Sequence, residues 1–354
     1  MTQPFVTVAM PCLNEEDYIE ECIRCVQHQD YPKDRIEILV ADGGSIDGTR
    51  EILQRLAKED DRIRIVDNPD RIQAAGLNAV IRRARGEVVI RMDVHAEYAE
   101  DFVRKCVEVL EKTGADNVGG AARAKAKTWF QRALCAALDS PLAVGGSKYR
   151  NPDNEGFVES VFPGAFRRRV FETVGLFDAR AVTNEDAEIN QRIRESGGKV
   201  YLSREIVVHY FPRDSFRALA KQYFKYGQGR ARTLLKHGGF PSIRPAIPFL
   251  MVSGEALLLA TSAWHPFSSW TLGAYAAATA GEAVRVGHHA GLAAIPVVWA
   301  IFPVLHVSHG AGFAAGLVKY TLAPDWTTEP ERLGEDAPSA SPAGRTNGAH
   351  ASRA

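Results

Sequence analysis

The sequence has few cysteines, no excess of charge of either sign and no apolar leader. Its 354 residues include five cysteines, and Lys+Arg and Asp+Glu both number 43, so the formal net charge is zero. An odd number of cysteines without a regular framework argues against a disulfide scaffold and fits a reduced, cytosolic catalytic part. The balanced charge gives no indication of a nucleic-acid partner. The N-terminus lacks the basic and apolar regions of a signal peptide, so we expect none.

A glycine-rich nucleotide fingerprint is also absent. The turn after the first expected strand reads Met-Pro-Cys-Leu-Asn-Glu-Glu over residues 10–16. It lacks Gly-x-Gly-x-x-Gly, which weighs against a dinucleotide-dependent dehydrogenase. Taken alone, this turn is explained at least as well by the start of a helix. Cys22 and Cys25 match half of a redox or zinc motif, but no second pair completes it. Cys22 shares a helical face with apolar neighbours, so we predict a core cysteine.

Apolar runs alternate with helical patterns through the N-terminal part of the chain. Strands are expected at residues 5–10, 36–41, 63–67 and 88–92, with helices at 16–29, 49–58 and 72–85. Such alternation predicts βαβ units and a mostly parallel sheet, which is an α/β fold. After Asp93 the pattern is less regular. Loop signals in residues 128–156 predict a long, mobile, lid-like loop beside the site.

Three acidic positions stand out in this pattern. Asp42 and Asp93 each close an apolar run, and Glu185-Asp186 lie further along the chain. Ligands bind outside the carboxyl ends of the strands in open α/β sheets. We therefore expect a nucleotide, a metal ion and a general base to meet in one cleft. Glycines after Asp42 let the backbone approach a ligand, although a tight turn with a helix cap explains the following residues equally well.

Asp93 and His95 are the expected metal ligands. Residues i and i+2 point the same way from an extended segment, so this carboxylate and imidazole can hold one divalent cation. Mixed oxygen and nitrogen ligation suits Mn²⁺ at least as well as Mg²⁺. An Asp-x-His pair is weak evidence by itself, and its place after a strand is what favours a metal site.

The second half of the chain becomes basic and then apolar. The expected helix at residues 215–237 has an apolar face and a strongly basic remainder, which fits an anionic membrane surface, although a solvated basic face is an alternative. Three apolar segments follow at residues 246–264, 270–284 and 291–317. The first and third are long enough to cross a bilayer, which takes about 20 residues. Burying the charges of Glu255 and Glu282 in a bilayer is costly unless they are paired or face protein. A soluble helical domain is therefore the alternative interpretation.

The sequence thus divides into three regions. We expect a catalytic domain at residues 1–237, transmembrane helices within 245–320 and a disordered polar tail at 324–354. Basic residues before the first apolar segment place that end in the cytoplasm. These features predict a multi-pass protein of the cytoplasmic membrane whose catalytic domain faces the cytoplasm.

Several short motifs occur together, in order and at suitable spacings. They are Pro11 with Asn14-Glu15-Glu16, Asp42-Gly-Gly-Ser with Asp47-Gly-Thr49, Asn68-Pro69, Gly76-Leu77-Asn78-Ala79, Gly86, Asp93-Val94-His95-Ala96 and Asn184-Glu185-Asp186. In combination they resemble the inverting family 2 glycosyltransferases with the GT-A fold, over about residues 5–237. The most similar subset is the membrane-tailed bacterial enzymes that build exopolysaccharides, including succinoglycan-type glucosyltransferases. Their Asp-x-Asp signature is often Asp-x-His-Ala, as here.

On the donor side, the resemblance implies a role for each matching residue. The nucleoside pocket would be lined by Pro11, Asn14 and Glu15, and Asp42 would bind the base. Asp93 and His95 would hold the cation on the donor diphosphate. His209, on a late expected strand, resembles a histidine that approaches the metal or the diphosphate, and a satisfied core histidine is the alternative.

On the acceptor side, the resemblance makes Asp186 the catalytic base and lets Glu185 orient the acceptor. The place of the Gln-x-x-Arg-Trp element of processive synthases is taken by Gln-Tyr-Phe-Lys-Tyr-Gly-Gln-Gly-Arg. This segment supplies Gln222, Tyr223, Tyr226, Gly227 and Arg230, of which Gln222, Tyr226 and Arg230 would contact the acceptor or the diphosphate. Because Lys-Tyr replaces Arg-Trp, we expect addition of a single sugar rather than processive polymerisation.

Elementary chemistry agrees with this assignment. Glycosyl transfer passes through an oxocarbenium-like state, the departing diphosphate needs a cation, and one carboxylate takes the proton of the acceptor hydroxyl. The sequence therefore predicts an enzyme dependent on Mn²⁺ or Mg²⁺ that uses a nucleotide diphosphate sugar. The family makes UDP-glucose or another UDP-hexose the expected donor. The apolar C-terminal part makes a polyprenyl-linked saccharide the expected acceptor and membrane lipid a further partner.

Two other classes of protein stay open. A nucleotide-sugar oxidoreductase or epimerase is disfavoured by the missing glycine fingerprint and by the absence of a Tyr-x-x-x-Lys pair near a strand end. A non-catalytic membrane subunit would keep the fold, but the intact Asp93, His95 and Asp186 argue against it.

Overall fold

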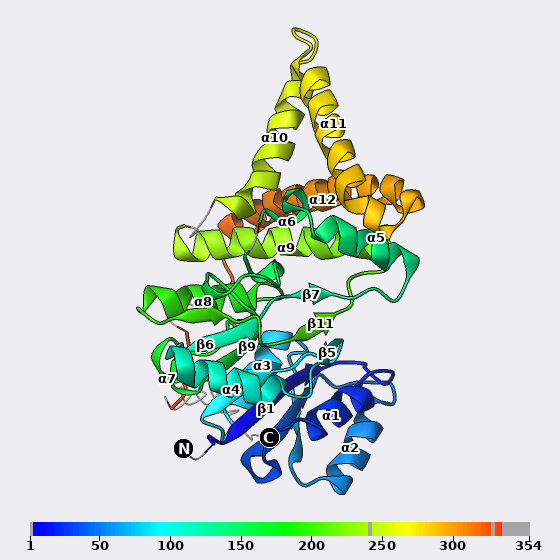
Figure 1. Cartoon of the computed structure of the whole chain (residues 1–354). Helices are drawn as coiled ribbons and strands as arrows, with labels where there is room; N and C mark the ends of the chain where they lie inside the picture. Colours follow the sequence, from blue (N-terminus) through cyan, green and yellow to red (C-terminus); the bar gives the residue numbers. More distant parts are fainter. Residues whose placement is uncertain (1–2, 147, 240–242, 327–329, 335–354) are drawn as a thin grey trace, which may run out of the picture.

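The computed structural model describes residues 3–146, 148–239, 243–326 and 330–334. Its N-terminal part is built on an eight-stranded sheet with the order β3-β2-β1-β4-β9-β6-β10-β8 (Figure 1). Strands β1 to β4 are parallel, and β9 runs antiparallel to both β4 and β6. The strands are β1 (Val6–Cys12), β2 (Ile36–Asp42), β3 (Ile63–Asp67), β4 (Val88–Arg91), β6 (Asn117–Gly120), β8 (Gly156–Phe157), β9 (Phe162–Arg167) and β10 (Val200–Leu202).

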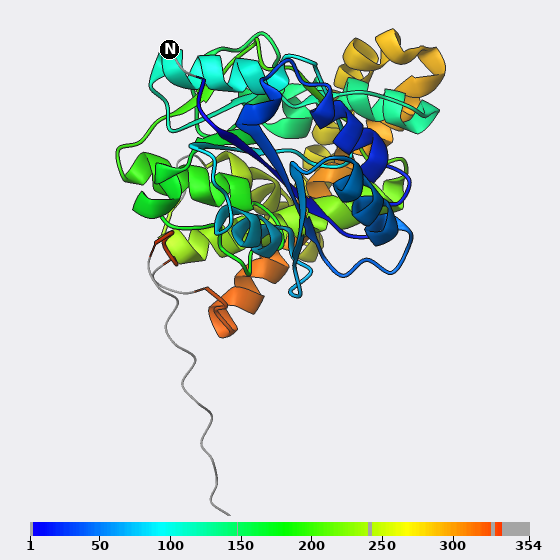
Figure 2. The same ribbon diagram turned by 90° about the horizontal axis from the view of Figure 1, so that it is seen from below.

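Helices cover both faces of the sheet because alternate strand residues point to opposite sides (Figure 2). Val8 and Met10 of β1 join a core with α1, α2 and α4, whereas Ala9 joins a core with α3, α7 and α8. The mostly parallel α/β sheet expected from the sequence is therefore confirmed. The helices are α1 (Ile19–Gln27), α2 (Thr49–Glu59) and α4 (Phe102–Thr113) on one face, and α3 (Gln73–Ile81), α7 (Arg169–Thr173) and α8 (Glu185–Glu195) on the other.

The cysteines behave as core residues. Cys22 of α1 is only 4% exposed, which confirms the prediction, and all five cysteines are free thiols. Burial raises the pKa of the Cys22 thiol, so it stays protonated and unreactive.

A small second sheet follows the carboxyl end of β4. Its order is β5-β11-β7, and it lies between the main sheet and the helices above it (Figure 1). Its strands are β5 (Ala96–Tyr98), β7 (Arg123–Ala124) and β11 (Val208–Tyr210).

Residues 129–138 and 141–144 are helical where the sequence predicted part of a long loop, so that prediction is wrong for this part, whereas residues 151–155 are irregular as predicted. Thr128 and Gln131 form a capping box that begins α5 (Trp129–Leu138), and α6 (Pro141–Val144) follows. Leu134 and Ala137 of α5 are buried against α11 and α12. The segment is therefore a packed part of the helical layer, and tertiary contacts override its loop signals.

The C-terminal helices form a layer of their own. They are α9 (Phe216–His237), α10 (Ile247–Ala260), α11 (Phe267–Gly287) and α12 (Ile295–Leu322). Helices α9 and α12 lie side by side across the molecule, while α10 and α11 stand up from them as a hairpin (Figure 1).

Glycines let α9 and α12 approach closely. A Cβ atom at Gly227 would collide with the carbonyl oxygen of His309, and one at Gly312 would collide with the carbonyl oxygen of Phe224. Close backbone approach through small residues is typical of helices that pack in an apolar environment. Gly227, which the sequence placed on the acceptor side, therefore serves the packing of the two helices.

One segment of the described chain, Leu292–Leu322, is long and apolar enough to cross a membrane. Helix α10 has 14 residues, fewer than the roughly 20 that a spanning helix needs. The expectation of a multi-pass protein is thus corrected to one candidate spanning helix. The α10–α11 hairpin instead exposes large apolar side chains near its tip, including Leu257, Trp264, Phe267 and Trp270.

The chain after α12 returns to the catalytic domain. Asp325 pairs with Arg232 of α9, Glu331 pairs with Arg82 of α3, and the backbone N–H of Leu333 donates to the carbonyl of Phe171. These residues do not form the free polar tail expected from residue 324 onward. The rest of that expectation, residues 335–354, lies outside the described residues.

Candidate active site

The carboxyl ends of β1, β2 and β4 meet at one edge of the sheet. Cys12 of β1 is level with Asp42 of β2, and Ala9 is level with Arg91 of β4. Pro11 near the end of β1, Glu15 beyond it and Asp93 beyond β4 line a cavity of about 1270 Å³. The parallel strands thus bring together residues that the sequence placed in one cleft.

The turn after β2 is fixed by Asn14 and Asp42. Asn14 adopts a left-handed conformation with φ of 55°, and its Oδ1 accepts from the Ile46 backbone N–H at 2.9 Å. Asp42 is 1% exposed and accepts from the backbone and hydroxyl of Ser45, while Arg50 Nη1 lies 2.8 Å from its Oδ2. Asn14 and Asp42 therefore hold this turn without themselves lining the cavity, so of the three acidic positions expected in one cleft only Asp93 and the pair Glu185-Asp186 line it.

Arg91 joins the metal position to the acidic pair. It is 5% exposed, its Nε and Nη2 lie 2.8 and 3.1 Å from the two oxygens of Asp93, and its Nη1 lies 2.9 Å from Glu185 Oε1. The same Nη1 also donates to Asp186. Burial opposes the charge of this guanidinium, but the three carboxylates raise its pKa well above the usual value.

The sequence prediction missed Arg91. Arg91 is the single charged residue inside the apolar run at 88–92. A buried charge requires a counter-charge, so this position could have indicated a buried ion pair. The partners Glu185 and Asp186 are more than ninety positions away, so local patterns could not name them.

Asp93 and His95 both face the cavity. His95 Nε2 lies 2.8 Å from Glu15 Oε2, and the edge of its ring packs on Tyr18. Across the residues described by the structure, no group of three or more His, Cys, Asp or Glu side chains could hold a metal ion. Asp93 and His95 would be two ligands of a cation, which would take its remaining oxygens from a bound diphosphate, as Mg²⁺ commonly does.

His209 does not reach this site. It lies on β11 opposite Glu97 and is absent from the cavity lining. Burial and the nearby Arg123 and Lys125 lower its pKa, which keeps it neutral. The structure therefore gives no support to a place for His209 at the metal, because its neighbours are Arg123, Lys125 and Glu97 and it lies outside the cavity lining.

Glu185 and Asp186 occupy the first turn of α8. Asn184, with φ of 65°, turns the chain into the helix, and its side chain donates to the Tyr226 carbonyl of α9. Burial raises the pKa of Asp186 to about 7; Arg91 opposes this, and Glu185 and Asp93 add to it. A carboxylate with such a pKa is suited to accept a proton near neutral pH.

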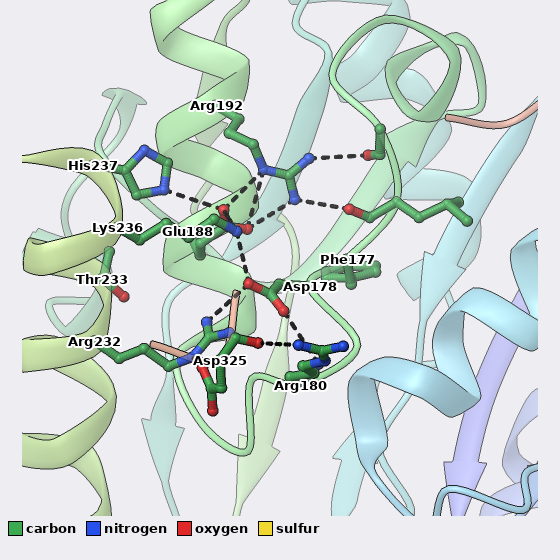
Figure 3. Close-up of polar contacts among 12 residues, drawn as sticks. Phe177, Asp178, Arg180, Glu188, Arg192, Arg232, Thr233, Lys236, His237 and Asp325 are labelled. Carbon is green, nitrogen blue, oxygen red and sulfur yellow. Dashed lines mark hydrogen bonds and ion pairs between the residues drawn. The ribbon is translucent and has the colours of Figure 1, made fainter. Parts of the chain in front are cut away.

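A buried ionic network holds α8 against α9 (Figure 3). Glu188 of α8 lies 2.9 Å from Lys236 Nζ and 3.2 Å from His237 Nε2, and it also pairs with Arg192. Asp178 accepts from both Lys236 and Arg232 of α9. The last basic residues of α9 are therefore turned inward, and the basic face expected over residues 215–237 is confined to its earlier part.

Helix α9 borders the far side of the cavity. Gln222, Tyr223, Tyr226 and Arg230 all line it, in line with the acceptor-side role that the resemblance implied. Gly229 lies against Thr183 and Asn184, so α9 touches the segment that carries the acidic pair. The metal position, the acidic pair and α9 thus share one cavity.

Comparison with known proteins decides the family. The model of Glycosyl transferase family 2 matches residues 7–175. Succinoglycan biosynthesis protein ExoA from Rhizobium meliloti (strain 1021) is 34% identical over 325 residues, covering 90% of this chain and 97% of that protein. The chain belongs to glycosyl transferase family 2. It is a glycosyltransferase that transfers a sugar from a nucleotide sugar.

A second relative in sequence and a similar solved structure agree with this family. A dolichyl N-acetyl-alpha-D-glucosaminyl phosphate 3-beta-D-2,3-diacetamido-2,3-dideoxy-beta-D-glucuronosyltransferase from Methanococcus voltae is 30% identical over 69% of this chain and 78% of its own. The mannosyltransferase PcManGT from Pyrobaculum calidifontis, solved in complex with GDP-Man and Mn²⁺, has a TM-score of 0.60 at 21% identity. That alignment covers 90% of this chain and 88% of the mannosyltransferase. This likeness shows that the family's GT-A fold is present.

Proposed function

We propose that this glycosyltransferase is a metal-dependent, inverting enzyme of exopolysaccharide or cell-surface glycan synthesis. It would move a hexose from a UDP-sugar to a lipid-linked saccharide. The observation that carries the proposal is Arg91, which holds Asp93 on one side and Glu185 and Asp186 on the other within one cavity. The metal position and the acidic pair are therefore close enough to act on one donor and one acceptor.

The residues divide into two sets of roles. Pro11, Glu15 and the turn held by Asn14 and Asp42 receive the nucleoside. Asp93 and His95, with Arg91 behind them, face the donor diphosphate. A divalent cation bound there supplies positive charge to the departing diphosphate. The name of the R. meliloti relative supports exopolysaccharide synthesis, and the Mn²⁺ in the Pyrobaculum complex supports a divalent cation.

Asp186 acts on the acceptor. Its carboxylate takes the proton of the acceptor hydroxyl while that oxygen forms a bond to the anomeric carbon, and the bond from that carbon to the diphosphate oxygen breaks. Glu185 orients the acceptor and, with Asp93, raises the pKa of Asp186. A single displacement of this kind inverts the anomeric centre and requires no protein nucleophile.

We place the enzyme at the cytoplasmic membrane with its catalytic domain in the cytoplasm. Arg217, Lys221 and Lys225 are exposed on the first part of α9, and the α10–α11 hairpin exposes an apolar tip. Basic side chains beside apolar ones fit the boundary of an anionic bilayer.

The test is turnover by the detergent-purified full chain. UDP- and GDP-hexoses are each supplied with Mn²⁺, Mg²⁺ or a chelator, and release of the nucleoside diphosphate is measured with a lipid-linked saccharide acceptor. We expect metal-dependent release from a UDP-hexose. If only a GDP-hexose were turned over, the donor would be a GDP-sugar instead of the proposed UDP-sugar. Donor binding without any turnover would favour a non-catalytic subunit. Bound nicotinamide would favour an oxidoreductase.

A further inference from the structure

The cavity continues beyond the acidic pair into a chamber whose part of the acceptor the roles above do not name. We call this part the arginine chamber and define it by Arg150, Arg230 and the tyrosines around them. Arg150 ends a short 3-10 turn (Lys148–Arg150), and its Nη1 donates to the Tyr210 hydroxyl at 2.9 Å. Tyrosine and arginine side chains of the chamber all line the cavity; they are Tyr149, Arg150, Tyr210, Tyr223, Tyr226 and Arg230.

Neither guanidinium of the chamber forms an ion pair with a carboxylate in the described part of the chain. The two carboxylates that act electrostatically on Arg230 are engaged elsewhere. Glu159 lies 2.7 Å from Arg244, and Asp186 is held by Arg91. Two desolvated positive charges without a counter-charge are costly, so the chamber is arranged for an anion.

The phenol of Tyr149 reports the positive potential of the two arginines. Burial would raise the pKa of Tyr149, but Arg150 and Arg230 lower it below its usual value. Tyr223 and Tyr226 both line the cavity with ring centroids 5.5 Å apart, and burial raises the pKa of both phenols, so their hydroxyls stay protonated donors. Paired guanidinium forks with phenol donors match the oxygens of a phosphate or diphosphate.

The far end of the chamber carries apolar side chains, which are Pro248 and Met251 of α10, Ala278 of α11 and Leu305 of α12. Polar side chains of the same helices stand among them, namely Tyr275, Thr279, His306 and His309. Helices α10 and α11 form the hairpin, whose loop end exposes Trp264 and Trp270. An anion bound between the arginines would therefore have Asp186 on one side and the partly apolar end of the cavity, at the hairpin, on the other.

We propose that Arg150 and Arg230 bind the diphosphate that links the acceptor saccharide to its lipid, with the start of the hydrocarbon lying between α10, α11 and α12. The inference rests on the proposed function and names the anionic linkage of its acceptor. It separates two diphosphates: that of the donor lies with Asp93 and His95, and that of the acceptor lies with the arginines. The saccharide between lipid and Asp186 is then oriented by both of its ends.

The experiment measures binding of farnesyl diphosphate to the detergent-purified full chain by calorimetry, with and without saturating UDP and Mn²⁺. Farnesol and inorganic pyrophosphate serve as partial probes. Arg150→Gln and Arg230→Gln are compared with Arg150→Lys, Arg230→Lys and the control Arg55→Gln, whose side chain is exposed on α2. UDP binding with Mn²⁺ is measured on every variant and also reports that the variant is folded.

We expect farnesyl diphosphate to bind in the presence of UDP and Mn²⁺, and both Gln variants to weaken it at least about tenfold, since each removes charged hydrogen bonds. The farnesyl diphosphate affinities of the two Lys variants should lie between those of the wild type and the Gln variants. The affinity of Arg55→Gln should equal that of the wild type. Competition by UDP, or loss of UDP affinity in the Gln variants, would assign the arginines to the donor and overturn the inference. Unchanged farnesyl diphosphate affinity in the Gln variants would overturn it as well. Failure of the wild type to bind UDP would instead count against the proposed function.

Discussion

Glu188 Oε1 of α8 lies 2.9 Å from Nζ of Lys236 on α9, at a position where the glutamate is 1% exposed. Helix α8 carries the proposed base in its first turn, and Glu188 follows Asp186 by two residues in the same turn. The position of Asp186 in the cavity is therefore set partly by charges on a helix that faces the apolar layer. Burial alone would raise the pKa of Glu188, but His237, Arg192 and Lys236 together lower it, so it is ionised at neutral pH.

We expect Glu188→Gln to lower the free energy of unfolding by about 3–5 kcal/mol, because it leaves buried cations without their counter-charge. Chemical denaturation at pH 7 measures this. Glu195→Gln is the matched control, since Glu195 is an exposed partner of His237 and should cost less than about 1 kcal/mol. Equal losses in the two variants would contradict the role given to Glu188.

Asp186→Asn should abolish transfer while leaving the donor bound. General-base catalysis contributes about 10²- to 10⁴-fold, and the amide cannot take the acceptor proton. Transfer is followed by release of nucleoside diphosphate, and donor affinity by calorimetry. Glu172→Gln, at an exposed position on α7, should behave as wild type. Transfer at the wild-type rate in Asp186→Asn would show that another group is the base.

The rate of transfer should fall on the acid side of neutrality. The pKa of Asp186 is raised to about 7, so the carboxylate is protonated below this pH and cannot accept the acceptor proton. We expect kcat/KM to rise with pH between about 6 and 8 and then level off. A profile that is flat through this range would exclude Asp186 as the titrating base.

Arg91→Met should move this profile to higher pH. Removal of the guanidinium leaves Asp93, Glu185 and Asp186 to repel one another, which raises the pKa of Asp186 further. Arg91→Lys keeps the charge but loses the fork that bridges Asp93 to Glu185, so a smaller shift is expected. The pH dependence of kcat/KM in the two variants tests whether Arg91→Met shifts the profile more than Arg91→Lys. A shift of either profile toward lower pH would contradict the prediction.

Gly312→Ala should loosen the contact between α9 and α12. The added methyl group would meet the carbonyl of Phe224, and overpacking of this kind costs about 1–3 kcal/mol. Gly273→Ala is the control, because a Cβ there meets no neighbouring atom. Thermal unfolding in detergent should show a lower midpoint for the first variant only. A rise in the midpoint of Gly312→Ala would mean that the helices are not in close contact.

The features of the fold that could be predicted from the sequence are those with a local periodic pattern of apolar residues. Alternating strands and helices gave the sheet, and a carboxylate after an apolar run marked Asp93 as a residue of the cavity. The parts that were missed depend on contacts between distant segments. Arg91 needs partners on α8, His209 was placed by a strand that joins a different sheet, and the packing of residues 128–156 depends on α12. The sequence predicted Lys236 as part of an exposed basic face, whereas in the structure it is paired with Asp178 and Glu188.

The return of Asp325 to Arg232 has a consequence for topology. Arg232 lies before the apolar hairpin and Asp325 follows α12, and the two side chains meet at 2.6 Å. The chain between them must leave and re-enter on one side of the membrane, so its number of crossings is even, zero included. With a single candidate spanning helix among the residues that the structure describes, this parity favours a monotopic attachment, in which the hairpin dips into one leaflet and both flanks remain on the same side of the membrane.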